Sequence, residues 1–231
     1  MSDQLTIYGY DDNPRTRIVK IVAAAEGIPL HQSLVVPRKG INKDTYLELF
    51  PLSQGKIPAI AGPGVKITET IAIAYYLAKL DPQAHLLGAT GTLAEEALVL
   101  SYVSFANQEL LPTLARWFLP LIPGFKDPAP YNFDAVEKGK QASLVILDKL
   151  ELALKGKEWL VGSRPTLADI FVGIMISRGL QWVLGRAWKE THPAIMAYFE
   201  RFSGLHMVSE VIPKFHLAEA EPLNQQPPAV P

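Results

Sequence analysis

The spacing of hydrophobic residues changes from a strand period to a helix period within residues 55–80. Ile57 and Ala59 alternate with small or turn-forming residues, and a Gly-Pro-Gly turn leads into a second extended segment at 65–67. Apolar side chains then recur at helical spacing until Asp81, where Asp-Pro ends the pattern. This stretch therefore predicts a β-hairpin followed directly by a helix.

Strand and helix patterns also alternate before the hairpin. Residues 5–10 alternate between two faces, as in a strand, and Pro14 begins a helix with Asn13 as its N-cap. We expect a second strand at 34–36 and a short helix at 46–50. The order strand, helix, strand, helix, hairpin, helix predicts a thioredoxin-like α/β domain.

Helical periodicity dominates the rest of the chain. A linker rich in Pro, Gly and Thr spans residues 82–92. A long amphipathic helix is expected at 93–116, bent at Pro112 because proline lacks an N–H and its ring clashes with the preceding turn. We therefore predict an all-α C-terminal domain at 93–220 after an N-terminal domain at 1–81.

Two features of the second half concern structure rather than chemistry. Thr166 and Asp169 have the Ser/Thr-x-x-acid spacing of a capping box, which predicts the start of a buried helix. The loss of Asp169 is therefore expected to reduce stability without a selective effect on activity. Residues 221–231 form a Pro-rich tail that we expect to be disordered.

Composition narrows the possible functions. The 231 residues are 48% hydrophobic with a net charge of −1, as in a globular protein that lacks the basic excess of a nucleic-acid-binding one. No apolar run reaches the ~18 residues that span a bilayer, and the first residues do not resemble a signal peptide, so we expect a cytoplasmic protein. The histidines lack metal-ligand spacing, and no metal is predicted. Because the chain has no cysteine, any thiol chemistry requires a ligand that supplies the sulfur.

The hairpin and the helix after it also predict a ligand site. Ile57-Pro58 is an X-Pro bond, where a cis linkage is energetically accessible and would turn the Ile57 N–H and C=O toward a peptide ligand. At the helix start, backbone N–H groups near Thr70 attract a carboxylate, and Glu69 can hold an amino group. In the structural alternative, Thr68 only caps the helix and Glu69 only complements its dipole.

Three segments carry a resemblance to a known family: GKIPAI…ITETIAIAYYLA, WLVGSRPTLADIFVGIMI and HPAIMAYFERF. They resemble the glutathione S-transferases, and are most similar to the transferase-like domain of the elongation factor gamma subunit and its stand-alone fungal relatives. The resemblance covers nearly the whole chain and implies glutathione as co-substrate. It also implies that Gln54 and Lys56 lie beside the bound tripeptide.

The loop after the first strand is where the resemblance places the group that stabilises the glutathione thiolate. A strand end beside a helix N-terminus offers backbone donors and a positive dipole end, which lower a thiol pKa from ~8.5 toward neutrality. We favour Tyr10 or Asn13 as the hydrogen-bond donor, with Arg15 contributing charge. In the structural alternative, Tyr8 packs within the strand, Asn13 only caps the helix and Arg15 only braces the loop.

The resemblance further implies that the long helix at 93–116 lines the site of an apolar co-substrate. Tyr102, Phe105 and Trp117 are the candidate residues, although aromatic residues at helical spacing are also common in cores. The expected reaction is attack of the glutathione thiolate on an apolar electrophile. Fungal relatives of this kind include detoxifying transferases and enzymes of secondary-metabolite pathways.

Three alternative functions stay open, one of which is the reduction of peroxides. Reversible addition of the thiolate to a conjugated alkene would make the chain a glutathione-dependent cis–trans isomerase. In a different class, the domain would serve assembly without catalysis, as in the elongation factor gamma subunit. That subunit continues through a charged linker into another domain, whereas this sequence ends in a short tail, which favours a free enzyme. The family also implies a homodimer.

Overall fold

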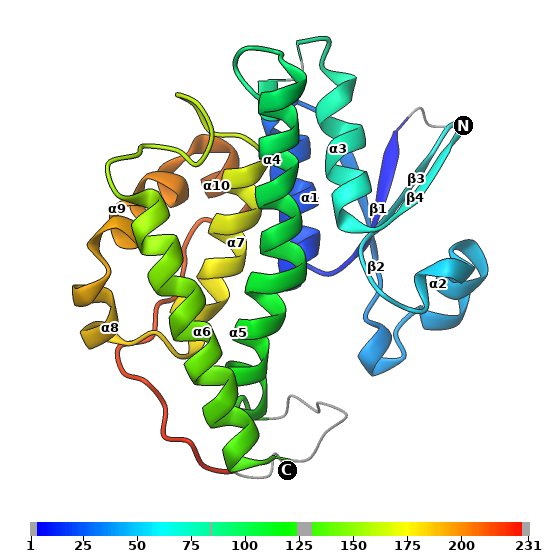
Figure 1. The fold of residues 1–231 in the computed structure, drawn as a ribbon. Helices are drawn as coiled ribbons and strands as arrows, with labels where there is room; N and C mark the ends of the chain where they lie inside the picture. Colours follow the sequence, from blue (N-terminus) through cyan, green and yellow to red (C-terminus); the bar gives the residue numbers. More distant parts are fainter. Residues whose placement is uncertain (1–3, 84, 124–130, 228–231) are drawn as a thin grey trace. The chain divides into compact units, whose positions relative to one another are not determined.

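The computed structural model describes residues 4–83, 85–123 and 131–227, and the chain divides into two compact units (Figure 1). The first unit comprises Met1–Ala97 and Leu205–Pro213, and the second comprises Leu98–Gly204 and Lys214–Pro231. The first unit thus includes a short helix from near the C-terminus, α10 (His206–Val211), because that helix packs against α1.

A four-stranded mixed sheet forms the centre of the first unit. Its elements are β1 (Leu5–Gly9), α1 (Pro14–Ala25), β2 (Leu30–Leu34), α2 (Lys43–Leu49), β3 (Ala59–Gly62), β4 (Val65–Thr68) and α3 (Thr70–Leu80), with 3₁₀ turns at Pro37–Lys39, Pro51–Ser53 and His85–Leu87. The strand order is β2-β1-β3-β4, with β1 and β2 parallel and the other pairs antiparallel. The predicted order of elements, including the hairpin, is confirmed.

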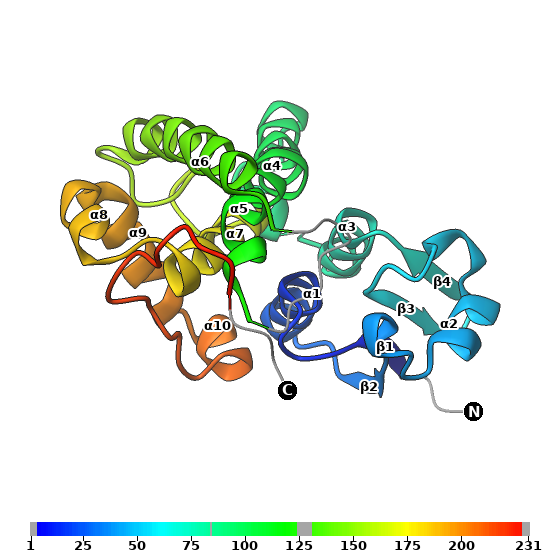
Figure 2. The same cartoon turned by 90° about the horizontal axis from the view of Figure 1, so that it is seen from below.

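Neighbouring residues of β1 point to opposite faces of the sheet. Ile7 is fully buried, on the face that α1 and α3 cover, whereas α2 lies on the other face (Figure 2). Tyr8 packs toward α2, with its ring 5.1 Å from that of Phe50 and 6.3 Å from that of Tyr46. The interpretation of Tyr8 as a packed strand residue is confirmed.

The second strand was predicted in the wrong place. It is β2, at Leu30–Leu34, and not the more apolar segment 34–36. Because β2 is an edge strand, pairing with β1 from Leu30 to Leu34 holds it and its side chains need not be apolar. Val35 instead packs into the hydrophobic cluster of Tyr46 and Phe50, and Val36 forms an isolated bridge to the following loop.

The second unit is built from helices packed around α7. Its elements are most of α4 (Leu93–Phe105), a π-helical turn (Ala106–Leu110), α5 (Leu111–Phe118), a 3₁₀ turn (Leu119–Leu121), α6 (Phe133–Leu154), α7 (Leu167–Trp182), α8 (Arg186–Thr191) and α9 (Pro193–Gly204). Side chains are buried all around α7, as expected for a central helix. Gly139 lets α6 approach α5, because a Cβ atom there would lie 2.8 Å from the main chain of Arg116. The predicted helical domain is confirmed.

The interruption predicted at Pro112 is a π-helical turn. Pro112 stands at the start of α5 and cannot donate a backbone hydrogen bond to the turn before it. The chain changes from α to π geometry at Ala106–Leu110, directly before α5.

The predicted capping box begins α7. Asp169 Oδ2 accepts the Thr166 N–H at 2.8 Å and the Thr166 hydroxyl at 3.1 Å. Its Oδ1 accepts the Leu160 N–H at 3.0 Å, a third bond that the spacing did not predict. Burial raises the pKa of Asp169, and the hydrogen bonds from Leu160 and Thr166 oppose that rise.

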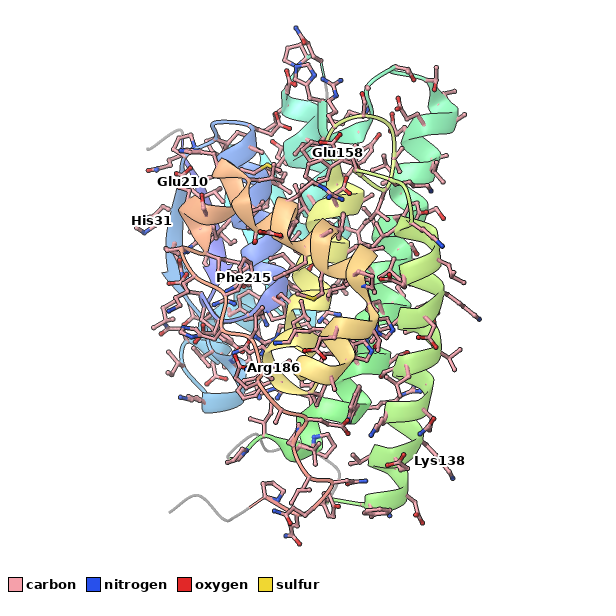
Figure 3. The ribbon with its side chains drawn as sticks, turned by 90° about the vertical axis from the view of Figure 1, so that its left-hand side faces the viewer. His31, Lys138, Glu158, Arg186, Glu210 and Phe215 are labelled. Atoms are coloured by element: carbon pink, nitrogen blue, oxygen red, sulfur yellow. The ribbon has the colours of Figure 1, made fainter. Side chains whose placement is uncertain are left out.

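The expectation of a disordered tail is wrong for residues 221–227, and residues 228–231 lie outside the described part of the chain. Two polar contacts hold this segment: Lys140 Nζ lies 2.6 Å from a carboxylate oxygen of Glu221, and the Tyr131 hydroxyl donates to Asn224 Oδ1 at 2.8 Å. Just before it, the ring of Phe215 (labelled in Figure 3) packs 5.2 Å from that of Phe199. The Pro-rich composition was misleading because these partners lie far away in the sequence.

Glu26 lies at the C-terminal end of α1, where a negative charge is unfavourable. Its Oε1 is buried and accepts no hydrogen bond from the described residues. Burial, and after it the charge of Asp81, raises the pKa of Glu26 to about 7 from an ordinary value of 4.5. The ionised carboxylate therefore destabilises the folded state.

We expect Glu26→Gln to stabilise the protein near pH 8 by about 1 kcal/mol and to leave stability almost unchanged near pH 4. The folded state holds this proton more tightly than the unfolded state, so the contribution of Glu26 to stability falls as the pH rises from about 4.5 to about 7. Solvent screens the half-exposed carboxylate and limits the gain. Urea unfolding of both proteins at the two pH values measures it, and equal differences at both would contradict the prediction.

Candidate functional site

The C-terminal end of β1 and the N-terminus of α1 approach closely, and the loop between them holds three predicted site residues. Gly9 makes this approach possible, because a Cβ atom there would lie 2.5 Å from the hydroxyl oxygen of Thr16. The backbone N–H of Asn13 donates to the carbonyl of Tyr10 at 3.1 Å, which closes the loop. The side chains of Tyr10, Asn13 and Arg15 are all half-buried.

Asn13 is the N-cap of α1, as predicted. Its Oδ1 accepts the N–H groups of Arg15 and Thr16, each at 3.0 Å. Capping occupies the acceptor end of the amide, whereas Nδ2 makes no hydrogen bond to any residue that the structure describes. The cap therefore orients the Asn13 side chain and leaves a donor beside the positive end of the α1 dipole.

The segment before β3 presents main-chain groups. The Ile57-Pro58 bond is cis. Ile57 precedes the first ladder pair of β3, and within the described residues neither its N–H nor its C=O is hydrogen-bonded. The side chains of Gln54 and Lys56 are exposed, that of Ile57 is half-buried and Pro58 is buried. The feature predicted from sequence, an unpaired peptide group at Ile57, is thus present.

Glu69, and not Thr68, occupies the N-cap position of α3. Thr68 is the last residue of β4, so the suggestion that it caps the helix is wrong. Glu69 is exposed with φ +68° and ψ 116°, a conformation that costs a non-glycine residue energy and is often found at functional sites. Its side chain makes no capping bond.

The first turn of α3 offers backbone donors. The first intrahelical bond runs from the Ile73 N–H to the Glu69 carbonyl at 3.0 Å, so the N–H groups of residues 70–72 precede it. Thr70, the first residue of the helix, is 4% exposed. A helix of eleven residues beginning here directs its positive dipole end toward the same region as these N–H groups.

Electrostatic effects connect the start of α3 with α1 and α2. Burial lowers the pKa of Arg15, and the negative charge of Glu69 opposes that change. Burial also raises the pKa of Tyr46 to about 12; a hydrogen bond with Ser53 opposes this rise and the charge of Glu69 adds to it. The charge of Glu69 therefore acts on both side chains. Because Ala59 pairs with Tyr8 and with Thr68, the loop after β1, the segment before β3 and the start of α3 lie at the same end of the sheet.

The remaining predicted residues belong to the second unit. Tyr102 and Phe105 are half-buried side chains near the end of α4. Trp117 is 2% exposed, and Lys140 Nζ lies 5.7 Å from the centroid of its ring, so Trp117 packs in the helical core between α5 and α6. Of the two roles considered for the aromatic residues, lining a co-substrate site or packing in the core, Trp117 has the second.

Tyr46 also belongs to this region, although its sequence context did not predict this. Its hydroxyl donates to the Lys56 carbonyl at 2.6 Å, ten residues away. Because the partner is a main-chain atom, no pattern of side chains in the sequence predicts the bond. Tyr46 therefore cannot be distinguished in sequence from an ordinary aromatic core residue.

Two other features, a metal site and a membrane-spanning helix, are absent from the described residues. No group of three or more His, Asp or Glu side chains there is placed to hold a metal ion. None of the helices in this part of the chain combines the length and apolar character needed to cross a bilayer.

Comparison with known proteins agrees with this architecture. Family models described as the N-terminal and C-terminal domains of glutathione S-transferase match residues 3–79 and 110–205. The chain is 36% identical over 224 residues to "Glutathione S-transferase stcT" of Emericella nidulans. The aligned region covers 96% of this chain and 98% of that protein. It is 35% identical over 196 residues to elongation factor 1-gamma of Schizosaccharomyces pombe, 84% of this chain but only 46% of that longer protein.

A solved structure shows the same fold. The GST-like domain of elongation factor 1-gamma from Saccharomyces cerevisiae superposes with a TM-score of 0.80 at 29% identity, covering 95% of this chain and 98% of that one. A thioredoxin-like domain followed by a helical domain defines the class of the protein. The chain belongs to the glutathione S-transferase family.

Proposed function

We propose that this protein binds glutathione in its first unit, ionises the thiol and presents the thiolate to an apolar electrophile. The observation that carries the proposal is the convergence of Asn13 and Arg15 from α1, Glu69 from the start of α3, and the segment 54–58. These groups complement a small peptide that carries a carboxylate, an ammonium group and a thiol.

Each part of the tripeptide has a partner in this arrangement. The Glu69 carboxylate takes the ammonium group, and the N–H groups of the first turn of α3, beginning at Thr70, take the neighbouring carboxylate. The N–H and C=O of Ile57, next to Pro58, pair with the peptide unit as an added strand would. Gln54 and Lys56 add exposed polar and cationic groups on the same segment.

The thiolate is the reacting group. Asn13 Nδ2 donates a hydrogen bond to the sulfur, and the α1 dipole and the Arg15 charge favour the ionised form. After the S–H proton leaves to solvent, the sulfur attacks an electrophilic carbon. A C–S bond forms while a leaving group departs or, in a conjugated alkene, while a neighbouring carbon takes up a proton. Tyr102 and Phe105 contact the apolar co-substrate in this proposal, whereas Trp117 is excluded because its ring is buried.

Titration of the bound thiol tests the function. We expect calorimetry to detect glutathione binding, and the ultraviolet absorbance of the thiolate to show a thiol pKa about 2 units below that of free glutathione, whose thiol resembles a cysteine thiol near ~8.5. Absence of binding would overturn the proposal. Product analysis with a conjugated enone then separates conjugation from cis–trans isomerisation, because only conjugation consumes glutathione.

The similarity to elongation factor 1-gamma supports a second candidate, a domain that serves assembly without catalysis. Such a domain would bind glutathione weakly or leave the thiol pKa at its ordinary value, so the same titration decides between the two.

The remaining parts of the proposal do not depend on the geometry of the site. They are a homodimer, a cytoplasmic location and a role in fungal secondary metabolism. Sedimentation of the purified chain measures its mass, and the mass of a single chain would remove the dimer from the proposal.

A further inference from the structure

Tyr46 is a buried tyrosine with both ends of its side chain fixed. It lies on α2 with 1% of its surface exposed, and its ring packs 5.3 Å from that of Phe50. Its hydroxyl donates to the Lys56 carbonyl at 2.6 Å. A phenylalanine would fill the same space in this apolar cluster, so packing alone does not account for the hydroxyl.

The bond to Lys56 controls the orientation of the next N–H. The carbonyl of Lys56 and the N–H of Ile57 belong to one planar peptide unit, in which they point in opposite directions. With the carbonyl held by Tyr46, the Ile57 N–H is directed away from Tyr46. Within the described residues that N–H has no hydrogen-bond partner, so no hydrogen bond of its own fixes its direction.

Ser53 holds the preceding residues of the segment, and its side chain also has a hydrogen bond with Tyr46. The Ser53 carbonyl accepts the Lys56 N–H at 2.9 Å, and the Ser53 hydroxyl oxygen accepts the Gly55 N–H at 3.2 Å. Ser53 therefore fixes the position of the turn, while Tyr46 sets the rotation of the peptide plane that follows it.

We propose that Tyr46 is a positioning residue for the glutathione site, whose hydroxyl holds the Lys56–Ile57 peptide so that the Ile57 N–H is pre-oriented toward the peptide part of the ligand. This inference rests on the proposed function. Pre-orientation matters because a free peptide plane would have to be ordered when the ligand binds, which weakens affinity. Tyr46 does not contact the reacting sulfur in this proposal, so it acts on binding and not on the chemical step.

Removal of the hydroxyl alone tests the role. We expect Tyr46→Phe to raise the dissociation constant and the KM for glutathione about fivefold, the effect of one lost hydrogen bond, while kcat at saturating glutathione and the pKa of the bound thiol stay within experimental error of wild type. In the ligand-free protein, the NMR order parameter of the Ile57 N–H should fall from about 0.85 toward about 0.6.

Tyr198→Phe is the matched control. The Tyr198 hydroxyl also donates to a main-chain carbonyl, that of Asp169 at 3.2 Å, and the side chain is fully buried in the second unit. This variant loses the same atom and the same kind of bond. It should therefore lose stability without a change in glutathione affinity or in the order parameter of Ile57.

The outcomes separate the two proposals. If wild type does not bind glutathione, the proposed function fails and this inference fails with it. If wild type binds and Tyr46→Phe binds within twofold as tightly, only the positioning role is overturned. Weaker binding with an unchanged Ile57 order parameter, or with an equal loss in Tyr198→Phe, also overturns it, because the hydroxyl would then act through general stability.

Discussion

Replacing Asp169 with alanine is expected to lower the free energy of unfolding by about 4 kcal/mol and the midpoint of thermal unfolding by about 10 °C. The side chain is fully buried and accepts three hydrogen bonds, two from Thr166 and one from the Leu160 N–H. Alanine leaves two buried backbone N–H groups without an acceptor, and each such group costs about 1–3 kcal/mol. The start of α7 and its connection to the segment before it would both be lost.

Asp134→Ala provides the control for this prediction. Asp134 also stands in the first turn of a helix of the second unit, α6, but its side chain is exposed and Asn132 supplies the cap there. Its loss should cost less than about 1 kcal/mol. Thermal and urea unfolding measure both variants, and a cost for Asp169→Ala as small as that for Asp134→Ala would contradict the expected role.

Activity measured on the folded fraction tests the expectation that the loss of Asp169 has no selective effect on catalysis. Because Asp169 holds a helix start and lies in the second unit, kcat/KM per folded Asp169→Ala molecule should match wild type. A loss of activity larger than the loss of folded protein would mean that Asp169 also affects the site.

The elements that sequence predicted correctly are those whose pattern is determined by their own residues. The β3–β4 hairpin depends on a Gly-Pro-Gly turn, the start of α1 on Asn13 and Pro14, and the start of α7 on the Thr166–Asp169 pair. Each combines a local conformational preference with a local partner. For this reason the fold class followed from the sequence without knowledge of any long-range contact.

The errors fall where the partner is distant in sequence. β2 is polar, and its position depends on main-chain pairing with β1, so the more apolar segment 34–36 was preferred. The C-terminal segment was judged from its prolines, although Glu221 and Asn224 are held by residues of another part of the chain. The composition of a segment indicates which structure it forms by itself, but it does not show the strand pairing or the side-chain contacts that a distant part of the chain provides.

The candidate site divides in the same way. Glu69 and Ile57 could be proposed from the sequence because their environment, a helix start and an X-Pro bond, is visible there. Tyr46 was missed because it acts on a carbonyl ten residues away. The positive φ of Glu69 was also not predictable, since only the connection from β4 to α3 imposes it.

The second large effect is expected at Asn13. Asn13→Asp should lower kcat/KM with glutathione near pH 7 about 100-fold or more, the usual cost of removing one donor from a developing or stabilised anion. Aspartate keeps the acceptor oxygen that caps α1, so the N–H groups of Arg15 and Thr16 stay paired and the helix start stays intact. The variant loses the Nδ2 donor and places a negative charge near the sulfur.

Both changes act on the thiol in the same direction. A carboxylate beside the thiolate disfavours its ionised form, and the missing donor no longer compensates, so the pKa of the bound thiol should return to ~8.5 or above. The loss of activity should therefore shrink as the pH rises. Thiolate absorbance and the pH dependence of kcat/KM measure the shift directly.

Two companion variants separate capping from catalysis at this position. Asn13→Ala removes both the cap and the donor, so it should lose about 1 kcal/mol of stability in addition to activity, whereas Asn13→Asp should lose activity alone. Tyr10→Phe removes the other candidate donor and should leave the thiol pKa unchanged. If Asn13→Asp is fully active and Tyr10→Phe is not, Asn13 only caps the helix and the thiolate donor is Tyr10. In our proposal a single side chain at a helix start uses its oxygen for the fold and its nitrogen for the ligand, and these variants separate the two uses.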